Sequence, residues 1–159
     1  MDKGKREDFM RQAIALAVEN VRAGRGGPFA AIVVRHGEVI ARGTNTVTTS
    51  NDPTAHAEVN AIRAACAVLG DFQLGDCDIY TTCEPCPMCL GAIYWARPRR
   101  IFFGATREDA ADVGFDDAMI YREIGCKPED RSFPMEQLLR DEAQAGFVAW
   151  REKGDRVDY

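Results

Sequence analysis

The chain has 159 residues, 46% of them hydrophobic and 28% charged, which is the balance of a single folded domain with one core. Its formal net charge of −5 argues against partners attracted by charge alone, so we expect neither a nucleic-acid partner nor a membrane surface. No stretch reaches the ~18 apolar residues of a membrane helix, and no apolar leader precedes the six cysteines, so we expect a cytoplasmic protein with reduced thiols.

The first third of the chain predicts one helix and a β-hairpin. Apolar side chains recur at helical spacing from Met10 to Val21, and the pattern stops near the glycine-rich stretch 24–27. Residues 28–43 then predict two strands joined by a two-residue turn at His36 and Gly37. We therefore assign His36 to the turn and give it no functional role.

The middle of the chain predicts two helices that alternate with two strands. Residues 55–70 are apolar on nearly every side, which indicates a helix packed between a sheet and other elements, ending at Gly70. A strand over 77–82, a helix over 86–96 and a strand over 99–105 follow. This order of elements predicts an α/β sandwich, in which helices cover both faces of one sheet.

The last third of the chain has weaker patterns. Residues 115–125 favour a short helix, and residues 140–154 favour a terminal helix before a polar tail. The run at 135–139 fits a strand as well as a helix. Because no linker or low-complexity tract interrupts the chain, we expect one domain over residues 1–159.

The stretch TTCEPCPMCLG, residues 81–91, carries the strongest chemical signal. Cys86 and Cys89 are three residues apart, and Pro87 stands where a first helical turn tolerates proline, so both sulfurs lie on one face at a helix N-terminus. The helix dipole and free N–H groups there favour thiolates. His56 begins another predicted helix, and zinc prefers thiolate and imidazole ligands. The sequence therefore predicts that two helix N-termini face one metal ion.

Three kinds of site remain compatible with these residues. A fourth ligand from Cys83 would make a closed structural zinc site, whereas His56, Cys86 and Cys89 alone would leave an open position, and a Cys-x-x-Cys pair would be a redox centre. Cys83 ends a strand, so its side chain fits the core as well as the metal. Glu58 cannot share a helix face with His56, yet both can reach a point beyond the helix end. Its alternative role is a first-turn acid that complements the helix dipole.

These residues resemble a known family. His-Ala-Glu at 56–58 followed by Pro-Cys-Pro-Met-Cys at 85–89 is similar to the zinc deaminase signature H-x-E…P-C-x-x-C. Within that superfamily the chain resembles bacterial guanine deaminases, through GGPFAA, NDPTAHAEVNAIR, TTCEPCPMCLGAIYWARP, GFDDAMIY and the final Asp-Tyr. The resemblance implies a cytidine deaminase-like, three-layer α/β/α sandwich around a mixed five-stranded sheet, with residues 135–139 as the last strand.

The resemblance also implies a reaction. One Zn²⁺ per subunit would be held by His56, Cys86 and Cys89, with Glu58 as general acid and base, and guanine would be hydrolysed to xanthine and ammonia. The purine base would be contacted by an amide, a carboxylate, a backbone N–H group and several aromatic rings: Asn45, Asp117, Ala57, Phe29, Trp95 and Phe115. Asp117 has an alternative role as a helix cap beside Asp116, and the rings are as suitable for a core.

The resemblance also implies a homodimer in which the segment of about 140–159 is exchanged between subunits, so that Tyr159 closes the partner's pocket. A frayed tail is the alternative. Two other functions stay open. A tRNA adenosine deaminase shares the His-Ala-Glu and cysteine motifs, but the acidic balance and GGPF oppose it. A binding module with structural zinc would leave Glu58 without a role.

Overall fold

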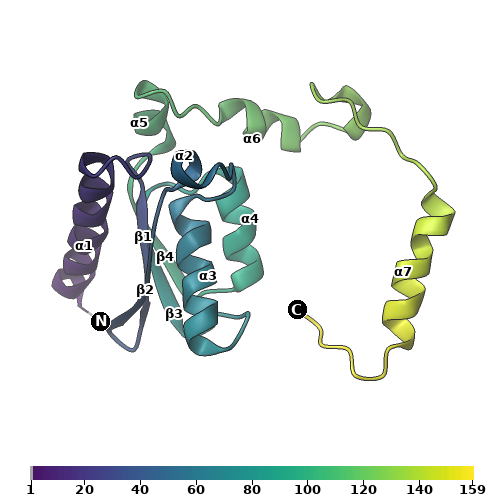
Figure 1. The fold of residues 1–159 in the computed structure, drawn as a ribbon, viewed down its shortest axis with the longest axis horizontal. Coiled ribbons are helices and arrows are strands. Elements are labelled where there is room, and N and C mark those ends of the chain that lie inside the picture. Colours follow the sequence, from purple (N-terminus) through teal and green to yellow (C-terminus); the bar gives the residue numbers. More distant parts are fainter. Residues whose placement is uncertain (1) are drawn as a thin grey trace. The chain divides into compact units, whose positions relative to one another are not determined.

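The computed structural model describes residues 2–159, which form two compact units. The first unit ends at Asp117 and contains a four-stranded mixed sheet in the order β2-β1-β3-β4 (Figure 1). The second unit is Ala118–Tyr159. None of the helices within residues 2–159 is both long enough and apolar enough to cross a membrane.

The sheet begins with the predicted hairpin. Strand β1 (Ala30–Arg35) pairs antiparallel with β2 (Glu38–Thr44), and the turn residues His36 and Gly37 have φ angles of 50° and 84°. Positive φ at both central positions matches the right-handed twist of the flanking strands, which is why a glycine stands second. The prediction of a turn at His36 is confirmed.

The other two strands complete the sheet on the opposite side of β1. Strand β3 (Cys77–Cys83) is antiparallel to β1, and β4 (Arg100–Ala105) is parallel to β3 and lies at the edge. The parallel pair is joined by a helix crossover, as parallel strands require. The sheet is therefore mixed, as expected.

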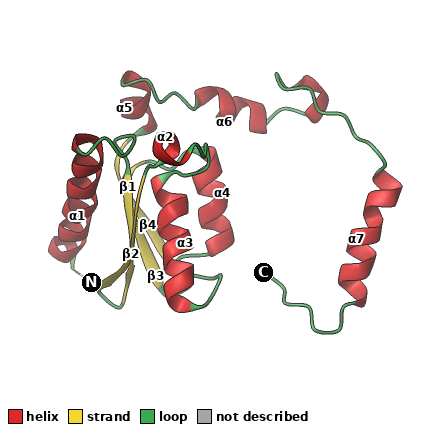
Figure 2. Cartoon of the chain, in the orientation of Figure 1, coloured by secondary structure: helices red, strands yellow, loops and turns green. Residues whose placement is uncertain are grey.

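Helices cover both faces of this sheet, which makes three layers (Figure 2). Helix α1 (Lys3–Arg22) packs on one face against Ile32, Val34 and Tyr80, while α3 (Ala57–Leu69) and α4 (Pro87–Ala96) pack on the other. Side chains alternate between faces along a strand, and β1 and β3 are buried on both faces. Strand β1 accordingly reads as an apolar run, whereas β3 also buries the polar Asp78 and Thr81.

Local sequence sets the ends of the two helices on the second face. Helix α3 starts after His56 and ends at Gly70, whose φ of 63° is the left-handed conformation common after a helix. Helix α4 starts after Cys86 with Pro87 in its first turn. Two short helices were not predicted, α2 (Val47–Ser50) and α5 (Arg107–Asp112).

The expectation of a five-stranded sheet is wrong for this chain. The structure has four strands, and residues 135–139 form no ladder within the described part of the chain. Leu139 has a φ of 49°, which is incompatible with extended backbone and interrupts the run before α7. The second unit instead contains α6 (Ala118–Ile124), a 3₁₀ turn (Pro128–Asp130) and α7 (Arg140–Glu152).

Candidate metal centre and catalytic site

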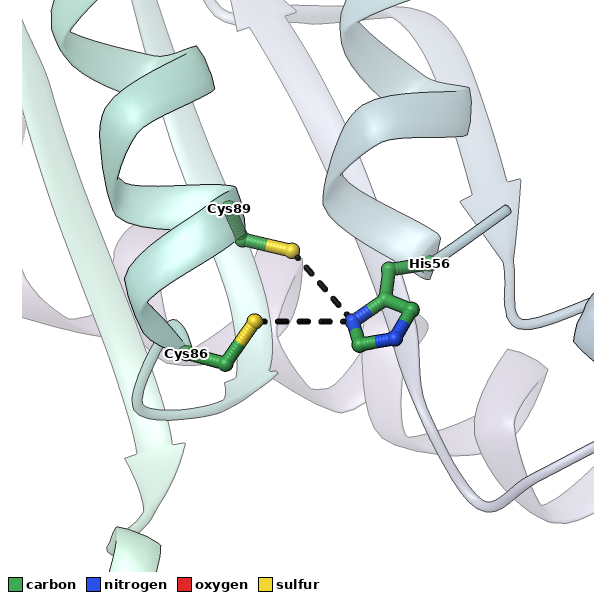
Figure 3. A group of neighbouring side chains, drawn as sticks. All are labelled: His56, Cys86 and Cys89. Carbon is green, nitrogen blue, oxygen red and sulfur yellow. Dashed lines mark hydrogen bonds between the residues drawn. The ribbon is translucent and has the colours of Figure 1, made fainter. Parts of the chain in front are cut away.

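The N-termini of α3 and α4 bring one imidazole and two thiols together (Figure 3). The Nδ1 atom of His56 lies 3.6 Å from Sγ of Cys86 and 3.5 Å from Sγ of Cys89. All three potential ligand atoms lie within 4.8 Å of one another. Residues about thirty positions apart in sequence therefore meet because two neighbouring helices begin at the same end of one sheet face.

The spacing of these atoms fits zinc. With Zn–S bonds of about 2.3 Å and Zn–N bonds of about 2.0–2.1 Å, tetrahedral geometry separates nitrogen from sulfur by about 3.6 Å. The two measured distances, 3.6 and 3.5 Å, agree with that separation. Two sulfurs and one imidazole nitrogen are also the donor types that zinc prefers. The group can therefore accept the ion with little rearrangement.

The charges in the group favour a metal as well. A hydrogen bond from Cys89, together with the interaction with His56, lowers the pKa of Cys86 to about 4, although burial opposes this. The same hydrogen bond to Cys86 raises the pKa of Cys89, and the bond to Cys86 raises the pKa of His56. The site thus holds a thiolate beside a thiol. The thiol would release its proton when a metal cation binds, since thiolate is the form that binds metal.

Cys83 lies outside this group. Its thiol donates to the carbonyl oxygen of Thr106 at 3.4 Å, and burial and the negative charge of Glu58 raise its pKa to about 11, so it stays protonated. In residues 2–159, no fourth His, Cys, Asp or Glu joins the three ligand atoms. Three protein ligands with one position open are the pattern of catalytic zinc, whereas a structural site has four.

Glu58 lies beside the three ligands, in the first turn of α3 and only 6% exposed. Its Oε1 atom accepts a hydrogen bond from the Thr81 hydroxyl at 3.0 Å, and its Oε2 atom faces the Cys89 thiol at 3.4 Å. Burial raises the pKa of this carboxyl. An acid that only complemented the helix dipole would stay in water, so burial beside the ligands favours a chemical role.

Asn45 directly follows β2, at the start of the segment that leads towards α3. Its Oδ1 atom accepts from the backbone N–H groups of Gly27 and Val47, each at 3.3 Å, and its carbonyl oxygen accepts from Asn20 at 2.8 Å. Because Oδ1 already has two donors, the side-chain NH₂ group is what Asn45 offers to a ligand. A bound molecule would have to present an acceptor to it.

Two predicted aromatic residues and one predicted acid also lie in the first unit. The rings of Phe29 and Phe115 meet edge to face, with centroids 4.9 Å apart and planes at 85°. Burial and the negative charge of Cys86 raise the pKa of Asp117, which places this carboxyl within electrostatic reach of the thiolate. Ala57 is fully buried and is the first residue of α3, next to His56.

Residues 3–105 match the family model of the cytidine and deoxycytidylate deaminase zinc-binding region, and this match includes His56, Glu58, Cys86 and Cys89. The chain belongs to this deaminase family. The family is zinc-binding, and the fit of the three ligand atoms to zinc agrees with that property.

Two curated deaminases show how far the likeness extends. The chain is 56% identical to guanine deaminase from Bacillus subtilis over 153 residues, which covers 96% of this chain and 98% of that protein. A crystal structure of the Bacillus subtilis enzyme matches with a TM-score of 0.95 and 55% identity, covering 100% of this chain and 99% of that one. A tRNA-specific adenosine deaminase from Agrobacterium fabrum is 46% identical over 103 residues, covering 64% of this chain and 66% of that protein.

Trp95 and Tyr159 were also predicted to contact the substrate of this deaminase. Trp95 is in the last turn of α4, about 13 Å of helical rise from Cys86 at 1.5 Å per residue, and 63% exposed. Tyr159 ends the second unit. Contact of Trp95 and Tyr159 with the substrate stays a prediction.

Sequence reasoning about the deaminase missed two residues that support the site. Asn60 donates through Nδ2 to the carbonyl oxygen of Thr44 at 2.9 Å and to the Thr46 hydroxyl at 3.1 Å, which ties both sides of Asn45 to α3. Thr81 binds Glu58 from strand β3. No sequence pattern distinguished Asn60 as a supporting residue. The alternation of side chains along a strand, in contrast, predicts that Thr81 is buried.

Proposed function

We propose that this deaminase hydrolyses guanine to xanthine and ammonia, with one Zn²⁺ per subunit bound by His56, Cys86 and Cys89. The observation that carries the proposal is the buried Glu58 carboxylate beside an imidazole and two thiols at zinc spacing. The likeness to a guanine deaminase over nearly the whole chain supports the choice of substrate.

When bound, zinc lowers the pKa of a water molecule towards ~7 and so supplies a nucleophile at neutral pH. Glu58 is the group that moves protons in this proposal. Its Oε2 atom faces the ligands, so it accepts a proton from the attacking water and delivers it to a ring nitrogen of the base. The same carboxyl group delivers the second proton of the water to the amine, which then leaves as ammonia. Each turnover consumes one water and releases one ammonia, and Glu58 ends as it began.

Recognition of guanine rests on complementary donors and acceptors. Guanine carries a carbonyl oxygen as well as N–H groups, whereas adenine lacks the carbonyl. The Asn45 NH₂ group suits the carbonyl oxygen, because its own Oδ1 is already bonded, and the Asp117 carboxylate suits the N–H groups. The backbone N–H of Ala57 is a further donor. Phe29, braced at its edge by Phe115, offers a ring face to the planar base.

We further propose that the protein is a cytoplasmic homodimer in which residues 140–159 are exchanged and Tyr159 closes the partner's pocket. Helix α7 has no buried side chain in residues 140–152, and it exposes Phe147 by 65%. Strand β4 is an edge strand with Phe103 half exposed. Exposed apolar surface and an open sheet edge both favour association. All six cysteines are free thiols, which suits a reducing compartment.

The test is to incubate purified protein separately with guanine, adenine, cytosine and tRNA, and to follow ammonia release and the ultraviolet spectrum. Xanthine from guanine alone is the expected result. Inosine formed in tRNA would replace the proposal with a tRNA adenosine deaminase. Zinc uptake without any deamination would leave only a zinc-binding module.

A further inference from the structure

Strand β3 places one hydroxyl on the face of the sheet that carries the site. Cys77 and Ile79 belong to the core under α3 and α4, whereas Tyr80 packs on the α1 side. By this alternation Thr81 points to the same side as Ile79, and it is only 1% exposed. Its hydroxyl is therefore removed from water.

A buried hydroxyl needs a hydrogen-bond partner, and the partner of Thr81 is Glu58. The hydroxyl donates to Oε1 of Glu58 at 3.0 Å. Valine has nearly the same shape and is at least as favourable in a strand, so packing alone does not require the hydroxyl at this position. The polar atom at residue 81 is explained by the carboxylate that it binds.

The second contact of Glu58 is different in kind. Oε2 accepts from the Cys89 thiol at 3.4 Å, and this contact depends on the proton of the thiol. A thiolate bound to zinc has no proton to donate, and its negative charge repels the carboxylate. Of the side chains in residues 2–159 that donate to Glu58, Thr81 is then the one that keeps its hydrogen.

We propose that Thr81 is a positioning residue for proton transfer: its hydroxyl fixes Oε1 of Glu58 so that Oε2 stays directed at the ligands. This inference rests on the proposed function, in which Glu58 carries the proton. The bond also joins α3 to β3, the strand that ends three residues before Cys86. It therefore connects the helix that follows His56 with the segment that carries Cys86. Loss of the hydroxyl frees the carboxylate to turn towards another donor.

Three variants test the proposal in zinc-loaded protein. Thr81→Val should lower kcat for guanine by about 10–100-fold with KM within about 2-fold, since a misplaced reacting group costs up to about 10²-fold. Thr81→Ser restores the hydroxyl and should stay within about 3-fold of the unmodified protein. Thr82→Val is the matched control on the opposite face of β3, where the Thr82 hydroxyl accepts from the Ala30 N–H at 3.1 Å, and it should keep kcat.

A double-mutant cycle separates positioning from a general loss of structure. If Thr81 acts through Glu58, Thr81→Val should add nothing to the loss already caused by Glu58→Gln. An unchanged kcat in Thr81→Val would overturn the proposal. So would an equal loss of activity in Thr81→Ser, or a loss that adds fully to that of Glu58→Gln.

A crystal structure of zinc-loaded Thr81→Val gives a readout that does not depend on the substrate. A Glu58 carboxylate turned away from its position in the unmodified protein would support positioning, and an unmoved carboxylate would overturn it. If the unmodified protein fails to deaminate guanine, the proposed function fails, while this structural comparison still decides the role of Thr81.

Discussion

Gly43 of β2 makes a close backbone contact with helix α3 near the site. A Cβ atom added at Gly43 would lie 2.2 Å from the carbonyl oxygen of Ala57, 2.4 Å from the nitrogen of Ala61 and 3.0 Å from its Cα. Non-bonded carbon contacts are favourable at about 3.5–4.0 Å, so Gly43→Ala requires α3 to retreat from the sheet by about 1 Å or more. No flexible side chain can relieve the clash, because all three atoms are backbone.

The retreat has two measurable consequences, because α3 carries Glu58 in its first turn and follows His56 directly. Overpacking of this kind destabilises a core by about 1–3 kcal/mol, or about 2–4 °C of melting temperature per kcal/mol in a chain of this size. A displacement of about 1 Å at the reacting group should reduce kcat/KM by about 10²-fold. Zinc content should fall as well, since His56 moves relative to Cys86 and Cys89.

Gly91→Ala is the matched control. Gly91 lies within α4, is exposed, and has no atom within 4 Å of the added Cβ. The exchange should stabilise the protein by about 0.5–1 kcal/mol and leave activity unchanged. Thermal unfolding, metal analysis and xanthine formation would be measured on both variants. A Gly43→Ala protein with unchanged stability and kcat/KM would refute the requirement for this close approach.

Four further outcomes are expected. Glu58→Gln keeps the size of the side chain but removes the proton carrier, so zinc content should be full and kcat lower by about 10²–10⁴-fold; turnover at the original rate would reject the mechanism. Cys83→Ser should retain zinc on metal analysis, because the Cys83 thiol bonds to Thr106 instead of joining the ligands, and loss of zinc would favour a closed site. Chelation should lower the melting temperature and Zn²⁺ should restore it, since a ligand at 100 times its Kd contributes about 2.7 kcal/mol; a transition indifferent to chelator would argue against a metal site in the folded protein. Ending the chain after Leu139 should yield a monomer in sedimentation experiments if residues 140–159 are exchanged, and a persistent dimer would argue against exchange.

Most of the first unit was predictable from local sequence, because its elements have strong periodicity and clear end signals. Pro87 after Cys86 and Gly70 after Leu69 mark helix ends that the structure confirms. Two helix N-termini with zinc-type ligands left the grouping of His56 with Cys86 and Cys89 as one of three kinds of site, and the resemblance to zinc deaminases selected it. The short helices α2 and α5 were missed, since four and six residues are too few for a periodic pattern.

Other features depend on contacts that the sequence does not state. The location of Cys83 was open because a strand end can face either the core or the metal, and the bond to Thr106 came only with the fold. The strand expected at 135–139 needed a ladder partner, and the chain supplies none in its described residues. Thr81 was predictable as buried, but its bond to Glu58 depends on how α3 lies across β3.

The hydrogen bonds of Asn60 connect the segment after β2 with the start of α3. Asn60 Nδ2 also lies 3.3 Å from the carbonyl oxygen of Ala55, which itself accepts from the Thr46 N–H at 3.0 Å, so the residue before His56 is tied to the residue after Asn45. A ligand that immobilises one of these residues must restrain the other, and such coupling is reciprocal. If Asn45 contacts the purine and His56 holds zinc, as proposed, a bound purine should raise the affinity for zinc, and zinc should raise the affinity for the purine by the same factor.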